Sequence, residues 1–250
     1  MLKEYEEKWP GKFIIKLSTK NQGITKNSNL AHFACRGKYI AWLGGDDLML
    51  PDKISTQVEY MENHPNCTIV YHNLEVFNSY SNKVLMYFNE KRKYSGDAST
   101  SIKYGTFNGA SSSMVRREKT PIHGFDERLP IASDRLYWVE TLINGGTIEY
   151  IDKVLGKYRR HTENITNINN ANIYIGHIDH INTCNIIMLK YPQYKKEALI
   201  ALSYTYRSLR LLYQKKYFIF FLLLSLKINF NFKAFFALAL SITTFGKNKK

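Results

Sequence analysis

Short apolar runs alternate with amphipathic stretches through the first two thirds of the chain. Continuous apolar runs at residues 39–43 and 67–77 predict strands, the first of them covered on both faces. Apolar residues at helical spacing predict helices over residues 51–63 and 134–144. Strand and helix signals that alternate with short loops favour an α/β fold whose mixed, mostly parallel sheet is flanked by helices.

Weaker signals complete this outline. Residues 1–9 have the character of the end of a helix, which Pro10-Gly11 stops. A loop from Asn21 leads into a helix that is expected to end at Gly37, because glycine is common just after a helix. Further strands are expected at residues 12–17, 83–88, 109–118 and 147–161.

The last third of the chain has a different pattern. Residues 171–216 predict two helices broken near Pro192, and the apolar segment 217–242 follows them. Its uninterrupted part, residues 217–226, is half of the roughly 20 residues that a membrane-spanning helix needs. Lys227 and Lys233 interrupt any longer stretch. The pattern therefore favours helices that lie on an anionic membrane surface.

Charge supports this division of the chain. The formal net charge is +14, and residues 157–250 hold 15 lysines and arginines against three acids. In residues 1–156 the 20 bases and 18 acids nearly cancel. The basic residues surround apolar helices and do not alternate with aromatic residues on a strand, so membrane contact is favoured and no nucleic-acid partner is expected.

The cysteines and the N-terminus indicate the compartment. Cys35, Cys67 and Cys184 are far apart and form no CxxC pair, which argues against a disulfide framework and against a zinc site. The first residues contain no apolar stretch of the signal-peptide kind. We expect a cytoplasmic protein that is peripheral on the inner face of the cell membrane.

Two adjacent carboxylates stand where a ligand is expected. Asp46 and Asp47 follow the first buried strand and two glycines, and in open α/β sheets ligands bind beyond the carboxyl ends of the strands. Neighbouring carboxylates suit a hard divalent cation such as Mg²⁺ or Mn²⁺, which prefers oxygen ligands and bridges phosphates. The alternative is a solvated turn, because Asp and Gly are common turn residues.

The surroundings of this pair strengthen the ligand interpretation. The segment "NQGITKNSNLAHFACRGKYIAWLGGDDLMLPDKISTQVEYMENHP" resembles the inverting family 2 glycosyltransferases, which have the GT-A nucleotide-sugar-binding fold. The matching positions are Asn21, Gly23, Asn29, Ala31, Gly37, Tyr39, Ile40, Asp46, Asp47, Pro51 and Lys53. The resemblance implies that Asn21, Gly23, Asn29 and Asp46 bind the donor and that Asp47 binds the metal. One departure is Gly44, where the family commonly has an aspartate.

A second block, "GASSSMVRREKTPIHGFDERLPIASDRLYWVETLINGGTIEYIDKVLGKYRRHTENIT", looks like the acceptor half of the same family. The resemblance implies that the small residues Gly109, Ala110 and Ser111 line the acceptor site and that Asp134 is the catalytic base. Inversion needs such a base, and general-base assistance contributes about 10²–10⁴-fold. The alternative is that Asp134 only caps the helix that it begins. Ser133 stands where the family often has an acid.

Positive charge gathers at the end of the last strand of this region, in "YRRHTENIT". By the resemblance this loop closes over the donor, so Arg160 is expected to meet the diphosphate and His161 to complete the metal shell. Arginine suits phosphate because its guanidinium donates two parallel hydrogen bonds. A solvated basic turn is the alternative for each of these residues.

The resemblance begins in the middle of the family's fold. A complete GT-A domain starts with two strands that hold the nucleotide base. By analogy with the family, we expect that roughly 50–60 residues containing these strands are missing before Met1. We therefore expect an N-terminally truncated GT-A domain over residues 1–167 and a basic, apolar helical tail over residues 168–250. Alone, such a chain is expected to bind nucleotide weakly.

The leading hypothesis is a glycosyltransferase that moves a sugar with inversion from a nucleotide-sugar donor to a lipid-linked or polysaccharide acceptor. Two other classes stay open. One is a catalytically inactive, membrane-associated interaction module. The other is a polymerase-like protein in which Asp46 and Asp47 bind metal, although no second acidic strand motif accompanies them. The donor sugar and the nucleotide base are not readable from the sequence.

Overall fold

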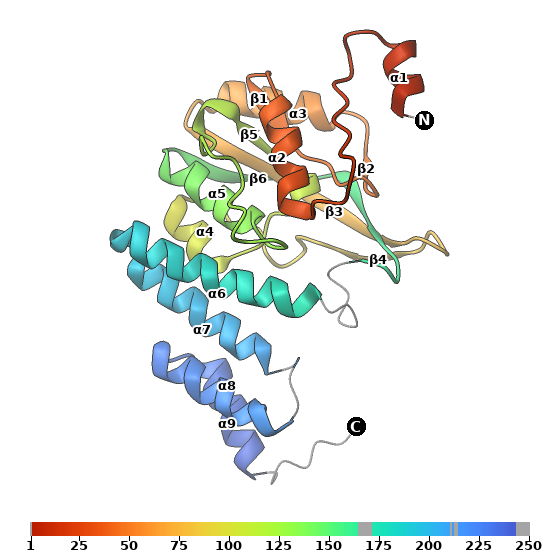
Figure 1. Cartoon of the computed structure of the whole chain (residues 1–250). Helices are drawn as coiled ribbons and strands as arrows, with labels where there is room; N and C mark the ends of the chain where they lie inside the picture. The colour runs from red at the N-terminus through yellow and green to blue at the C-terminus, as the bar shows by residue number, and fades with distance from the viewer. Residues whose placement is uncertain (1, 165–171, 211, 213–214, 244–250) are drawn as a thin grey trace.

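The computed structural model describes residues 2–164, 172–210, 212 and 215–243. Within these ranges the chain forms a six-stranded mixed sheet with helices on both faces (Figure 1). The strands are β1 (Tyr39–Ala41), β2 (Leu48–Met49), β3 (Cys67–Asn78), β4 (Val84–Tyr87), β5 (Ser113–Arg116) and β6 (Thr147–Arg160). The α/β fold predicted from the apolar pattern is confirmed.

The helices account for most of the remaining described chain. They are α1 (Leu2–Lys8), α2 (Ile24–Ala34), α3 (Lys53–Asn63), α4 (Ala98–Tyr104), α5 (Asp134–Ile143), α6 (Asn172–Lys190), α7 (Lys195–Leu209), α8 (Lys215–Ile228) and α9 (Phe232–Thr243). Short 3₁₀ turns occur at Ala110–Ser112, Arg117–Lys119 and Pro192–Tyr194. The two predicted helices on either side of Pro192 are therefore α6 and α7.

The sheet follows the order β1-β5-β3-β6-β2, with β4 paired to the outer part of β3. Only the long β3–β6 pair is parallel among the described strands, and the other four pairings are antiparallel. The prediction of a mostly parallel sheet is thus wrong. The apolar pattern shows that a strand is buried on both faces, but helices can cover both faces of an antiparallel pair as well.

The core explains why β3 carries so continuous an apolar run. Alternate residues of a strand point to opposite faces of the sheet. Ile69 and Tyr71 pack toward Tyr137 and Trp138 of α5, whereas Val70 packs toward the α3 side. The sheet is therefore the middle layer of three, with α5 and α3 on opposite faces.

Three local predictions are wrong. Residues 12–17 are not a strand, because no described strand lies beside them to complete a ladder of backbone hydrogen bonds. Helix α2 ends at Ala34, three residues before Gly37, since Cys35 already has an extended backbone. Helix α3 begins at Lys53, because Asp52 adopts a left-handed conformation with φ 64°.

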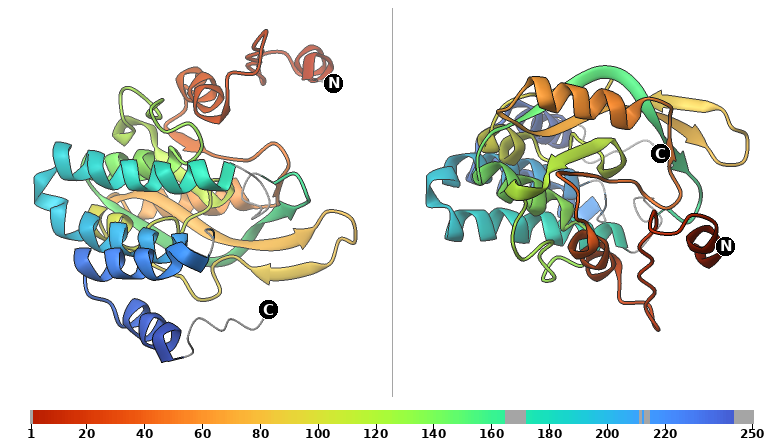
Figure 2. Two further views of the ribbon diagram at one scale, coloured as in Figure 1. Left: turned by 60° about the horizontal axis from the view of Figure 1, so that its bottom comes forward. Right: turned by 90° about the horizontal axis from the view of Figure 1, so that it is seen from above.

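The C-terminal helices continue from the sheet domain. Ile187 of α6 and Ala198 of α7 share a buried cluster with Ile102 of α4 and with Leu136 of α5. Figure 2 shows α6 and α7 against the domain and α8 and α9 beyond them. The domain boundary expected between residues 167 and 168 lies outside the described residues. Among those that are described, no helix has both the length and the apolar character needed to cross a membrane.

Candidate active site

The turn after β1 is built around Gly44. The backbone amide of Gly44 donates a hydrogen bond of 2.8 Å to Ser111 Oγ, and Ser111 Oγ donates in turn to Asp47 Oδ2. A Cβ at position 44 would lie 3.0 Å from Asp47 Oδ2 and 3.3 Å from Ser111 Oγ. Glycine at the position where the family commonly has an aspartate thus lets this turn close on Ser111.

Asp47 joins three segments of the chain. Its Oδ1 accepts a hydrogen bond of 2.9 Å from the backbone amide of Arg159 at the end of β6, while Oδ2 accepts from Ser111. Burial raises the pKa of this half-buried carboxyl group, against the opposing effect of the hydrogen bond from Ser111. Both oxygens of Asp47 therefore have protein donors.

Asp46 has a different environment. Its exposed carboxylate lies with Oδ2 3.2 Å from Nε2 of His161, and its backbone carbonyl accepts a 2.7 Å hydrogen bond from Arg159 Nε. The structure thus brings His161 to Asp46, whereas the resemblance pairs it with Asp47 in one metal shell. Among the described residues no group of three His, Cys, Asp or Glu side chains is arranged to hold a metal ion.

Lys53 supports this turn from within the protein. Its side chain is fully buried, and Nζ donates to the carbonyl oxygens of Trp42 at 3.1 Å and Ser111 at 2.8 Å. Desolvation lowers the pKa of Lys53 to about 8, although the nearby Asp47 acts in the opposite direction. Lys53 is one of the positions that match the family resemblance, but its buried contacts were not predicted from the sequence.

Asp134 is the first residue of α5. Its Oδ1 accepts a 2.8 Å hydrogen bond from the backbone amide of Arg135, which is a local contact at the helix start. Burial raises the pKa of Asp134 above the ordinary range. A carboxyl group with a raised pKa in a cavity is suited to proton transfer.

Asp179 is a residue that sequence reasoning missed. It is buried in α6, and its Oδ2 accepts hydrogen bonds from the backbone amides of Ile131 at 2.8 Å and Ala132 at 2.9 Å. These contacts fix the loop that leads directly into Asp134. The available signal was that Asp179 is the single acidic residue in the sequence of residues 172–190.

One pocket of about 760 Å³ collects most of these groups. Seven of the predicted site residues line it, namely Asp46, Asp47, Gly109, Ala110, Ser111, Asp134 and His161. Much of the remaining wall is apolar, including Ile24, Leu74, Phe88, Ile131 and Ile173. Helix α6 closes another side with Gly176, His177 and His180. The structure therefore brings the two blocks together, although Asp134 follows Asp47 by 87 residues in the sequence.

Four other predicted residues do not line this pocket. Asn21 accepts a 2.9 Å hydrogen bond from the amide of Gly23, whose φ of 82° sets the start of α2. Arg160 lies with its guanidinium 5.8 Å from the ring centroid of Tyr158. Asn29 is buried and bonds to both backbone polar groups of Phe125. Their predicted role in donor binding stays a prediction.

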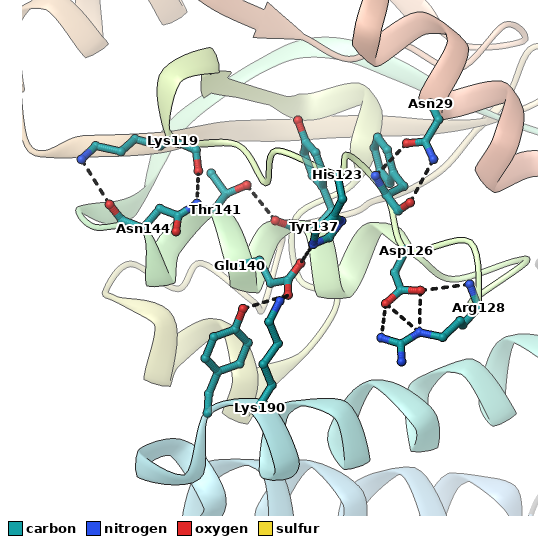
Figure 3. Close-up of polar contacts among 12 residues, drawn as sticks. Asn29, Lys119, His123, Asp126, Arg128, Tyr137, Glu140, Thr141, Asn144 and Lys190 are labelled. Atoms are coloured by element: carbon teal, nitrogen blue, oxygen red, sulfur yellow. Dashed lines mark hydrogen bonds and ion pairs between the residues drawn. The ribbon is translucent and has the colours of Figure 1, made fainter.

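Two polar clusters stabilise the packing of the segments around α5 (Figure 3). Asn29 ties α2 to the turn at Phe125, and a Cβ on Gly124 would lie 2.4 Å from Asn29 Oδ1. Buried Glu140 accepts hydrogen bonds from Lys190 Nζ at 2.7 Å and from Tyr191 at 2.9 Å, and it lies 3.1 Å from His123 Nε2. Glu140 thereby fixes α5, and Asp134 with it, against the end of α6.

A family model matches the N-terminal part of the chain. The model for "Glycosyl transferase family 2" matches residues 1–118. This match covers 118 of the 250 residues, slightly less than half of the chain. The matched segment contains the Asp46–Asp47 turn and the Gly109–Ser111 loop, and it ends before Asp134.

The chain is also similar to relatives of known sequence. The chain is 29% identical over 163 residues to "Uncharacterized glycosyltransferase MJ1057" of Methanocaldococcus jannaschii, covering 64% of this chain and 54% of that protein. It is 28% identical over 167 residues to "Uncharacterized protein Rv1520" of Mycobacterium tuberculosis, covering 65% of this chain and 46% of that protein. The chain thus spans about half the length of these relatives.

Solved structures share the fold. TarS of S. aureus, residues 1–349, is similar with a TM-score of 0.51 and 14% identity, covering 99% of this chain and 79% of that one. The same protein in complex with UDP gives a TM-score of 0.52 with 15% identity, covering 99% and 80%. TarS has also been crystallised with UDP-GlcNAc. At this identity the likeness shows the fold, and the predicted GT-A type of fold is confirmed.

Proposed function

We propose that this chain carries the metal-binding and acceptor-binding parts of an inverting glycosyltransferase that uses a nucleotide-sugar donor. The observation that carries the proposal is the shared pocket, which Asp46 and Asp47 enter from the end of β1 and Asp134 from the start of α5. In-line displacement of a nucleoside diphosphate needs a carboxylate base on the side of the attacking hydroxyl, and Asp134 is proposed as that base.

The environment of Asp134 suits this role. A base works best when its pKa lies near the working pH, and burial moves the pKa of Asp134 in that direction. Its contacts with the Arg135 amide and the packing fixed by Asp179 and Glu140 hold the carboxylate at one place in the pocket. In the proposed reaction Asp134 accepts the proton of the acceptor hydroxyl. The hydroxyl oxygen bonds to the sugar carbon as the nucleoside diphosphate leaves.

For a divalent cation the geometry favours Asp46. Its carboxylate and the His161 ring meet at 3.2 Å, so both can bind one ion, whereas both oxygens of Asp47 already accept hydrogen bonds. Mg²⁺ is commonly bound by one or two side chains together with substrate phosphates. We propose that Asp46 and His161 hold Mg²⁺ or Mn²⁺, which would offset negative charge on the diphosphate, while Asp47 orients the turn.

The complexes of TarS with UDP and UDP-GlcNAc support a uridine nucleotide as the first donor to test. The apolar share of the pocket wall supports an acceptor with an apolar part, as a lipid-linked sugar has. Exposed Phe232, Phe235 and Phe236 on α9, next to exposed Lys233, support attachment to an anionic membrane surface on the cytoplasmic side. Polysaccharide acceptors remain within this proposal.

The test is nucleotide binding followed by donor turnover. Thermal shifts with UDP, GDP and dTDP are measured with Mn²⁺, and the release of UDP from UDP-sugars is then followed. We expect at least one nucleotide to raise the melting temperature, and Asp46→Asn to abolish the part that depends on Mn²⁺. Asp152→Asn is the matched control, since Asp152 is an exposed carboxylate paired with Lys93. Absence of binding by all three nucleotides at millimolar concentration would contradict the proposal.

Membrane attachment has its own measurement. Sedimentation with vesicles of phosphatidylglycerol is compared with sedimentation with phosphatidylcholine alone. The proposal requires binding to the anionic vesicles, and the double change Phe235→Ser with Phe236→Ser should remove it. Equal recovery of the wild-type chain with both vesicle types would overturn this part and leave the donor chemistry untouched.

A further inference from the structure

A second, smaller pocket lies between α4, α5, α6 and α7. Its volume is about 190 Å³, and its polar lining includes Arg92, Lys103, Arg135, His180, Tyr204 and Ser208. None of the described residues that line it is acidic. Figure 1 shows these four helices below the sheet.

Arg135 is the central observation. Only 5% of this residue is exposed, and its described hydrogen bond runs from Nη2 to the carbonyl oxygen of Ile102 at 3.2 Å. Its buried Nε has no hydrogen-bond partner, and the guanidinium takes part in none of the described ion pairs, although its charge acts on the neighbouring Asp134. A buried guanidinium is always charged, and burial of a charge that has no ion-pair partner is costly. Arg135 therefore lines a pocket that has no acidic lining residue, and its buried Nε lacks a hydrogen-bond partner.

The contacts with α4 offset only part of this charge. Arg92 Nη2 donates 2.6 Å to the carbonyl oxygen of Tyr104, next to the contact of Arg135 with Ile102. The C-terminus of a helix carries roughly half an elementary negative charge. Arg92, Lys103 and Arg135 contribute three positive charges, so the pocket keeps a clear excess of positive charge.

The other polar groups agree with an anionic ligand. His180 lines the pocket, and its pKa is lowered to about 3 by burial first and then by the charges of Arg135 and His177. It is therefore neutral and can donate from one ring nitrogen, and its buried Nδ1 has no partner. Tyr204 adds a hydroxyl group to the same wall.

We propose that this second pocket binds a phosphoryl group, with Arg135 and Lys103 as its principal ligands and Arg92 at the rim. Arginine donates in a planar fork that fits phosphate oxygens, and a lysine supplies a compact charge beside it. Thr106 and His180 line both this pocket and the larger one. A phosphate-bearing molecule held here therefore lies against the wall of the proposed active site. The site is independent of the donor chemistry proposed above.

The test uses soluble phosphoryl probes without metal. Calorimetry with inorganic pyrophosphate is carried out in EDTA at constant ionic strength, and dihexanoyl phosphatidic acid below its micelle concentration is the second probe. We expect at least one probe to bind and Lys103→Gln to weaken it by about tenfold or more, because a charge-assisted hydrogen bond is lost. Preference for pyrophosphate assigns the site to a free phosphate compound, and preference for the lipid assigns it to a headgroup.

Three variants keep the outcome clear. Arg135→Gln should abolish binding, and Arg92→Gln, at an exposed residue, serves if Arg135→Gln does not fold. Lys83→Gln is the matched control, because Lys83 is an exposed lysine in the turn between β3 and β4. The proposal would be overturned if Asp46→Asn or Lys83→Gln weakened binding of the probe while Lys103→Gln and Arg92→Gln left it unchanged. So would the absence of binding by both probes.

Discussion

The two pockets share a wall but have opposite charge. Asp46, Asp47 and Asp134 line the larger one, whereas Arg92, Lys103 and Arg135 line the smaller. The neighbours Asp134 and Arg135 begin the same helix and open into different pockets. Successive helical residues point roughly 100° apart, since a turn contains about 3.6 residues. One helix start can thus provide a base to one site and a cation to the other.

Removal of the base from the acidic pocket has the largest expected effect. Asp134→Asn should lower donor turnover with acceptor by about 10²–10⁴-fold, because the amide cannot accept the hydroxyl proton. The measurement is steady-state turnover beside the nucleotide-binding isotherm, which should stay unchanged. Asp152→Asn should keep wild-type turnover. Retained activity in Asp134→Asn would leave this carboxylate with the role of a helix cap.

The next prediction concerns the support beneath the acidic turn. Lys53→Met should lower the free energy of unfolding by about 2–4 kcal/mol, since each buried acceptor left without a donor costs about 1–3 kcal/mol. The carbonyl groups of Trp42 and Ser111 lose their donor in this variant. Urea denaturation measures the change, and Lys38→Met, at an exposed ion pair with Glu62, should change stability by less than about 1 kcal/mol. Equal effects of both variants would contradict the support role.

Substitutions of the two adjacent aspartates should have different effects. Asp46→Asn is expected to weaken Mn²⁺ binding in the presence of nucleotide by at least about tenfold, because second-shell changes alone reach about 10–100-fold. Asp47→Asn should mainly lower the melting temperature, because its carboxylate joins Ser111 to Arg159. Titration of Mn²⁺ followed by electron paramagnetic resonance distinguishes the two. If Asp47→Asn instead weakened Mn²⁺ binding more than Asp46→Asn did, the metal would be assigned to Asp47, as the family resemblance implied.

The smallest expected effect links the two pockets. Because burial raises the pKa of Asp134, the acidic limb of kcat/KM should lie above the ordinary aspartate value of about 3.9. Activity is present above the folded-state pKa and is lost as the pH falls through it. The charge of Arg135 lowers the pKa of Asp134, so Arg135→Gln should move this limb to higher pH. A pH profile that does not move would show that the guanidinium does not influence the base.

Much of the fold was predictable because it depends on local pattern. The continuous run of β3 and the apolar spacing of α5 gave those elements correctly, since burial on both faces or on one helical face leaves a direct mark in the sequence. Residues 12–17 have an equally good strand pattern but no described strand to pair with. The direction of strand pairing was also out of reach, because a strand with both faces buried looks the same in parallel and antiparallel surroundings.

The sequence by itself determined which chemical groups are present and that they follow strands or begin helices. Asp46 and Asp47 could be named because polar residues just beyond an apolar strand stand at an edge of the sheet, and Asp134 because its segment resembles the acceptor half of the family. Only the tertiary structure decided their partners. Asp46 meets His161, which is 115 residues away, and Asp179 of α6 holds the loop before Asp134. It also left the buried Nε of Arg135 without a hydrogen-bond partner, beside a pocket that no acidic residue lines. Contacts between distant segments depend on how helices and strands pack, and local hydrophobic spacing carries no record of that packing.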